Sequence, residues 1–194
     1  MKIIIVDNNS KFINRLVSIF KQYDYKVIRW DQLTSDTLRA DTVVLPGSKN
    51  HSLRPKKSDL FIYTSEIRLL RDFNKLLLGV CAGFELLVKE YVGKIERSER
   101  RILGKRKIKV IKNDPLFESI FNPTAYEAHH FVVKDAGPEL SALAASKYGI
   151  EAVKHKTKPY YGVQFHPDAW WTRTFGRHII NNFLTFAISY TQQS

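Results

Sequence analysis

Short apolar runs and segments with helical periodicity alternate along the first half of the chain. The isoleucine-rich run Lys2–Asp7 predicts a buried strand, and the apolar residues after it recur at helical spacing up to Phe20. Further strands are predicted at Lys26–Trp30, Asp41–Gly47 and Leu76–Val80, further helices over 59–72 and Phe84–Tyr91, and a loop over 48–58. This alternation predicts an α/β fold with a central, mostly parallel twisted sheet flanked by helices.

The second half of the chain is dominated by predicted strands. They fall near 93–96, 105–111, 124–133, 150–154 and 160–165, with a short helical turn at Pro115–Phe121 and a last helix from about Thr172. This change of pattern indicates a smaller β-rich addition to one parallel sheet. The 194 residues suit one domain, which we place at residues 1–190.

The composition is that of an ordinary globular protein, with 44% hydrophobic and 26% charged residues. The lone cysteine excludes an internal disulfide and is compatible with a reducing compartment. The longest apolar runs fall short of a membrane span, and the N-terminal run is too short for a signal peptide. We therefore expect a cytoplasmic protein with no membrane contact, no cofactor and no metal site.

The clearest chemical signal is the segment Gly79–Gly83, which reads Gly-Val-Cys-Ala-Gly between a predicted strand and a predicted helix. This pattern is typical of a nucleophile elbow, a tight turn that exposes a reactive side chain. Cys81 would stand at a helix N-terminus, where the helix dipole favours the thiolate. The alternative is a buried structural cysteine, since free cysteines are often core residues.

A cysteine nucleophile needs a base and an oxyanion hole. The backbone N–H of Ala82 is one expected oxyanion donor, and Gly47 or Ser48 would supply the second. His166 closes a predicted strand and is followed by a proline, and Asp168 is well spaced to orient its imidazole. The sequence therefore predicts a Cys–His–Asp amide hydrolase.

The two motifs together resemble the glutaminase domain of class I glutamine amidotransferases. The family pairs a Gly-x-Cys-x-Gly elbow with a Gly-Val-Gln-Phe-His-Pro-Glu signature, and this chain has GVCAG and YGVQFHPD. Leu45–Gly47 matches the family's oxyanion strand, and His129 and His130 fall where the family often has a histidine facing the site. The resemblance implies a glutaminase subunit that hydrolyses the γ-amide of glutamine through a Cys81 thioester and passes ammonia to a separate synthase subunit. The C-terminal pattern favours the GMP-synthase-like branch.

Two positions depart from the family pattern. Asp168 stands where the family has glutamate, and Glu85 stands where many glutaminases have a glutamine that holds the substrate. The segment Gly83-Phe84-Glu85 is similar to the related γ-glutamyl hydrolases. The alternatives are therefore a γ-glutamyl peptidase or hydrolase without a synthase partner, and a non-catalytic relative that binds a ligand.

The net charge of +12 indicates an anionic partner or a basic, solvated surface. The stretch 94–112 carries nine Lys/Arg residues against two Glu. It lacks the interleaved aromatic residues of a nucleic-acid site, so nucleic-acid binding is not favoured. A solvated surface and a docking face for an acidic synthase subunit remain open.

Overall fold

The computed structural model describes residues 1–49, 60–121 and 123–193. Its strands form one sheet in the order β2-β1-β3-β4-β10-β9-β7-β5, with β8 paired to β9 and β6 paired to β8. The strands are β1 (Lys2–Asp7), β2 (Asp24–Arg29), β3 (Thr42–Leu45), β4 (Leu76–Val80), β5 (Lys94–Lys107), β6 (Lys109–Val110), β7 (Thr124–Asp135), β8 (Leu140–Ala145), β9 (Ile150–His155) and β10 (Tyr160–Val163).

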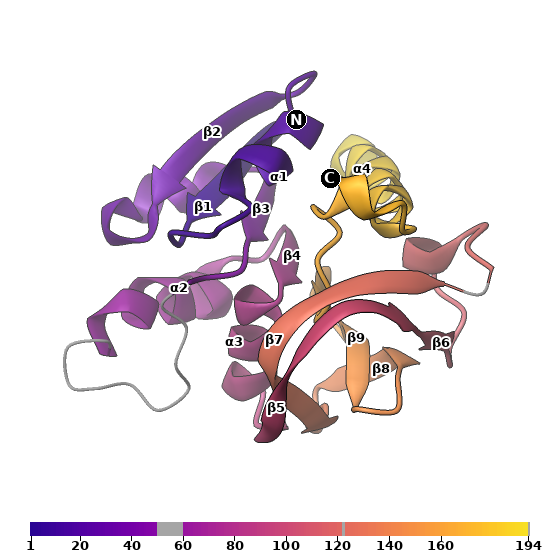
Figure 1. Cartoon of the computed structure of the whole chain (residues 1–194). Helices are drawn as coiled ribbons and strands as arrows, with labels where there is room; N and C mark the ends of the chain where they lie inside the picture. Colours follow the sequence, from indigo (N-terminus) through magenta and orange to yellow (C-terminus); the bar gives the residue numbers. More distant parts are fainter. Residues whose placement is uncertain (50–59, 122, 194) are drawn as a thin grey trace.

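The sheet has a parallel part and an antiparallel part (Figure 1). Neighbours from β2 to β10 pair in parallel. From β10 outward, through β9 and β7 to the edge strand β5, the pairing is antiparallel. This confirms the predicted α/β domain with a parallel sheet and a β-rich addition. The carboxyl ends of β1, β3, β4 and β10 meet at one edge, where ligands of open α/β sheets bind.

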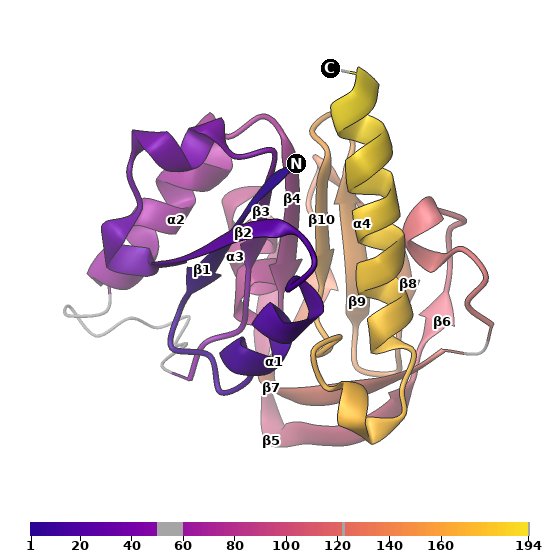
Figure 2. The ribbon, with the colours of Figure 1, turned by 90° about the horizontal axis from the view of Figure 1, so that it is seen from above.

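Helices cover both faces of the parallel part (Figure 2). They are α1 (Ile13–Ile19), α2 (Leu60–Asp72), α3 (Ala82–Glu90) and α4 (Gly176–Gln193), with short 3-10 turns at Trp30–Gln32, Ser35–Arg39, Pro115–Phe117 and Trp170–Thr172. One core cluster joins α2 and α3 to one face. Two others join α1 and α4 to the opposite face. No helix within the described ranges is both long and apolar enough to cross a membrane.

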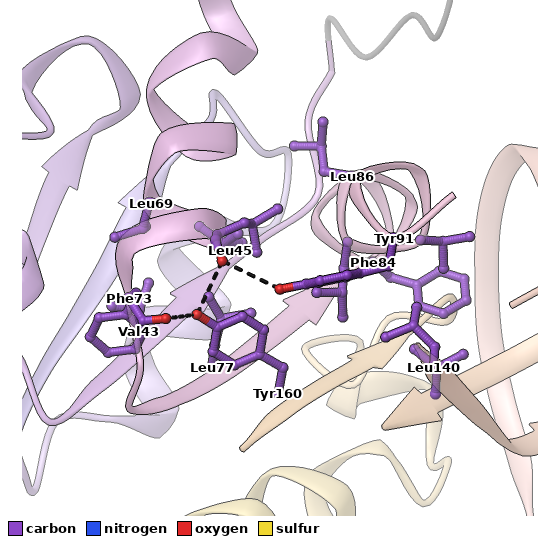
Figure 3. Packing of buried hydrophobic residues seen from close by; sticks show 14 of the residues in the cluster. Val43, Leu45, Leu69, Phe73, Leu77, Phe84, Leu86, Tyr91, Leu140 and Tyr160 are labelled. Carbon is purple, nitrogen blue, oxygen red and sulfur yellow. Dashed lines mark hydrogen bonds between the residues drawn. The ribbon is translucent and has the colours of Figure 1, made fainter. Parts of the chain in front are cut away.

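The core on the α2–α3 side fixes the helix that follows the elbow (Figure 3). Phe84 is fully buried there beside Leu45 and Leu77 from the central strands. The Tyr160 hydroxyl lies within hydrogen-bond reach of the carbonyl oxygens of Leu70 and Phe73, at the end of α2. The Tyr160 contacts tie the start of β10 to the end of α2, and the packing of Phe84 holds α3 against the central strands.

Several predicted boundaries differ from the observed ones. The strands expected near 93–96 and 105–111 are one long strand, β5, followed by the two-residue β6. Strand β8 was not predicted, and the last helix begins at Gly176 rather than near Thr172. Most of the predicted loop 48–58, and the first residue of the helix expected over 59–72, lie outside the described residues.

Candidate active site

Cys81 occupies a sharp turn between β4 and α3. Its φ and ψ angles are 51° and −104°, so it is one of the few non-glycine residues with positive φ. Such a conformation costs on the order of 1–3 kcal/mol and persists only where surrounding contacts impose it. Its backbone N–H donates to the Val163 carbonyl at 2.9 Å, which ties the turn to β10.

The glycines on either side of Cys81 allow this turn. A Cβ atom on Gly83 would overlap the carbonyl oxygen of Leu45, and one on Gly79 would lie 2.7 Å from the Gly83 backbone. Helix α3 can therefore approach β3 this closely only because both residues lack a side chain. The same approach brings Gly47 beside the site, where an added Cβ would lie 3.2 Å from His166 Cε1 and 3.8 Å from Cys81 Sγ.

His166 follows the end of β10 and faces Cys81. Its Nδ1 atom lies 3.1 Å from Oδ1 of Asp168, and both side chains are buried. The ring is also close enough to hydrogen-bond to the Cys81 thiol. Phe12, from the loop between β1 and α1, packs edge-on against the imidazole with ring centroids 4.8 Å apart. The imidazole is therefore held on three sides.

Burial and neighbouring charges act differently on the pKa values of Cys81 and His166. Burial raises the pKa of the Cys81 thiol, while the neighbouring His166 acts in the opposite direction. Burial alone would lower the pKa of His166, but the charges of Cys81 and Asp168 hold that pKa well above its ordinary value. A thiolate at Cys81 and the Asp168 carboxylate therefore both favour the protonated imidazole, which can stabilise the thiolate or donate a proton.

A pocket of about 340 Å³ opens above Cys81 and His166. Of the predicted site residues it is lined by Ser48, Cys81, Glu85, His129, His130 and His166. Ala82 is buried at the first position of α3, where its N–H lacks an intrahelical partner. Asp168 is fully buried against the side of His166. The structure thus brings every predicted site residue to one region.

The basic side chains around the pocket were not predicted as site residues. Lys11, Lys49 and Arg101 line it together with the acidic Glu85. Arg101 lies in the stretch of β5 where the pairing register with β7 shifts, between Arg97 and Ile102. A small ligand carrying both a carboxylate and an ammonium group would find opposite charges here.

Glu85 is held by a residue of the histidine motif. Gln164 Nε2 donates to Glu85 Oε1 at 2.9 Å, and both side chains are buried. This bond links α3, which carries the elbow, to the segment that carries His166. Gln164 lies inside the YGVQFHPD motif, but its partner could not be inferred from that motif.

His129 is a buried wall residue, while His130, next along β7, is exposed. His129 Nε2 lies 2.8 Å from Glu127 Oε2, and His129 Nδ1 lies 2.6 Å from the Phe131 carbonyl oxygen. No motif singles out Glu127, so sequence reasoning missed it. His155 has a structural setting, since its Nδ1 accepts the backbone N–H groups of Thr157 and Lys158.

The similarity to known proteins extends over nearly the whole chain. A family model described as "Glutamine amidotransferase class-I" matches residues 4–186. The chain is 29% identical to a glutamine-hydrolyzing GMP synthase subunit of Pyrococcus abyssi, over 93% of this chain and 96% of the relative. It is 29% identical to anthranilate synthase component 2 of Methanocaldococcus jannaschii, over 94% and 96% of the two chains.

Solved structures show the same fold. The crystal structure of a GMP synthase subunit from Thermoplasma acidophilum superposes with a TM-score of 0.86 at 25% identity, covering 99% of this chain and 96% of the other. A glutamine amidotransferase from Thermotoga maritima superposes with a TM-score of 0.75, over 87% and 76% of the two chains. At 15% identity, the second likeness concerns the fold alone.

Proposed function

The chain belongs to the class-I glutamine amidotransferase family, and from this premise we propose that Cys81, His166 and Asp168 hydrolyse the γ-amide of glutamine. One observation carries the proposal: Cys81 stands at positive φ on the elbow, inside a pocket it shares with a His166 imidazole held by Asp168. A merely structural cysteine does not need this strained geometry.

In the proposed reaction, the Cys81 thiolate attacks the γ-carboxamide carbon of glutamine. Negative charge develops on the amide oxygen, where the N–H groups of Ala82 and of Gly47 or Ser48 would stabilise it. The His166 imidazolium donates its proton to the leaving nitrogen, so that ammonia departs and a glutamyl thioester remains. Neutral His166 then takes a proton from water, which attacks the thioester and releases glutamate and the Cys81 thiol.

The pocket charges support an amino-acid substrate. We propose that Glu85 faces the substrate's α-ammonium group and that the basic side chains Lys11, Lys49 and Arg101 attract its α-carboxylate. His129 and His130 complete the wall. Gln164 would hold the Glu85 carboxylate in place for this contact.

We propose that the ammonia passes to a separate synthase subunit of the GMP-synthase kind. Support comes from the similarity to glutamine-hydrolyzing GMP synthase subunits over nearly the whole chain. Residues 1–190 would act as one functional domain. A thiolate mechanism needs Cys81 to stay reduced, which fits the cytoplasm.

The test is ammonia and glutamate release from glutamine by the purified protein, alone and with the synthase subunit of the same organism. Cys81→Ser should lower the rate by several orders of magnitude while leaving the fold intact. Iodoacetamide should label Cys81 and abolish the activity of the parent protein. A Cys81→Ser variant with full activity would contradict a covalent mechanism.

A γ-glutamyl peptidase is the second candidate, because Glu85 replaces the glutamine of many glutaminases. Glu85→Gln removes the charge but can still accept the Gln164 hydrogen bond. For a glutaminase, we expect glutamine turnover to hold or improve in this variant. For a peptidase, turnover of a γ-glutamyl dipeptide should fall. A protein that turns over neither substrate, with or without the synthase subunit, would be a non-catalytic relative.

A further inference from the structure

A compact group of ionisable side chains lies on the antiparallel part of the sheet, and one member, His129, lines the pocket. Glu127 and His129 are two residues apart and lie on the same face of β7, and Glu151 lies on the neighbouring β9. Each residue offers a ligand atom, and these atoms lie within 4.8 Å of one another. The three side chains are at most 5% exposed, so solvent contributes little to their charge balance.

The two carboxyl groups face one another, and each has one oxygen without a hydrogen-bond partner among the described residues. Burial raises the pKa of the Glu151 carboxyl, and the neighbouring Glu127 raises it further. Ser146 donates to Glu151 Oε1 at 2.5 Å. Glu127 Oε1 and Glu151 Oε2 have no hydrogen-bond partner within the described part of the chain, although both are buried. Buried, facing carboxylates require a proton or a cation between them.

His129 is oriented as a metal-binding histidine would be. Its Nδ1 lies 2.6 Å from the Phe131 carbonyl oxygen, which can only accept, so Nδ1 carries the proton. In the neutral ring the Nε2 lone pair then points at Glu127 Oε2, 2.8 Å away. A metal-binding histidine has this arrangement, with one nitrogen fixed by a backbone carbonyl and the other directed at the metal.

We propose that Glu127, His129 and Glu151 form a binding site for a divalent transition-metal ion of the zinc class. Imidazole nitrogen and carboxylate oxygen are both ligands of Zn²⁺, and three protein ligands leave the fourth position to water. Tetrahedral ligands at about 2.1 Å lie roughly 3.4 Å apart, so ligand atoms that now lie up to 4.8 Å from one another would move closer together around the ion. The ion would replace the Glu127–His129 hydrogen bond and neutralise both carboxylates. Hard cations such as Mg²⁺ and Ca²⁺ prefer all-oxygen sites and should bind poorly.

The experiment uses tag-free full-length protein with Cys81→Ser as the parent, because a free thiolate would bind zinc by itself. After treatment with a chelator, the protein is titrated with ZnCl₂ by calorimetry. We expect one equivalent of zinc to bind. We also expect the melting temperature to rise by roughly 5–10 °C when zinc is about 100-fold above its Kd. MgCl₂ should give neither effect.

Glu127→Gln, His129→Gln and Glu151→Gln keep the side-chain volume, and each should weaken zinc binding by at least ~100-fold. His130→Gln is the matched control: it removes the adjacent, exposed imidazole and should bind zinc like the parent.

Circular dichroism checks folding, and any one folded variant suffices for the test. A parent that binds no zinc would overturn the proposal. Equal binding in the Glu151→Gln variant would overturn it as well. Both outcomes concern zinc binding alone, and the glutamine hydrolysis proposed for Cys81 is tested separately.

Discussion

At the residue scale, the shortened carboxylate Asp168 acts together with Cys81 to favour the protonated form of His166. Its Oδ1 contacts the imidazole at 3.1 Å and contributes to the raised pKa of His166. Asp168→Asn removes the negative charge, so the imidazolium should lose its proton at a lower pH. We expect the alkaline limb of the kcat/KM–pH profile to move to lower pH, and the activity to fall less than in His166→Ala.

Two further variants sharpen this test. Asp168→Glu restores the carboxylate found in the family signature and keeps the charge, so the alkaline limb should stay where it is in the parent. An Asp168→Asn variant as inactive as Cys81→Ala would show that Asp168 does more than orient and charge the imidazole. An unmoved limb would show that the profile does not report His166.

The sequence predicted which residues meet in the pocket where a local motif carried the signal. Cys81, Glu85, His166 and Asp168 all lie in two short motifs, and the structure places these motifs together; their roles in catalysis remain predictions. Glu127 and Glu151 could not be found in this way. They meet only because β7 and β9 are neighbours in the sheet, and that pairing depends on the packing of distant segments.

At the element scale, a buried pair joins the end of β1 to helix α2. Asn8 Nδ2 donates to Glu66 Oε1 at 2.5 Å, and burial raises the pKa of Glu66 to about 8. The folded-state pKa lies above the unfolded value of 4.5. The protonated carboxyl therefore stabilises the fold fully below pH 4.5, and this contribution is lost as the pH rises through 8. The loss is on the order of 3–5 kcal/mol.

Glu66→Gln keeps an uncharged side chain of similar size at every pH. We expect this variant to gain stability relative to the parent as the pH rises from 5 to 8, as measured by urea unfolding. Glu99→Gln, on the exposed edge strand β5, is the control and should show no comparable gain. An equal free-energy difference at pH 5 and pH 8 would mean that Glu66 does not titrate in this range.

Most elements could be predicted from the period of the apolar residues, and the exceptions have physical reasons. The strand β8 has the sequence LSALAA, and alanine has a low β propensity, so the strand forms by pairing with β9 rather than by local preference. The long β5 carries charged residues at most positions and lacks a clear alternation. Its extent is set by its pairing with β7, which a register shift interrupts before Ile102.

At the scale of the whole molecule, positive charge is concentrated along one edge of the sheet. Eight of the nine basic residues in 94–112 are exposed, and β5 pairs with β7 alone among the described strands. Charged side chains on an edge strand also discourage edge-to-edge association of sheets. Because Arg101 of the same strand lines the pocket, this edge lies beside the proposed source of ammonia.

A synthase subunit that docks here would need an acidic surface, since its association would depend on these charges. We expect a double variant, Arg97→Glu with Arg100→Glu, to bind the synthase subunit more weakly and with a smaller salt dependence. Neither residue lines the pocket, so glutamine hydrolysis by the isolated protein should not change.

The matched control is Lys21→Glu with Lys26→Glu, which makes the same change of charge at exposed positions by β2, the opposite edge of the sheet. Binding is measured by calorimetry at several salt concentrations. Equal weakening by both double variants would mean that overall charge guides association, and no weakening by either would place the docking face elsewhere.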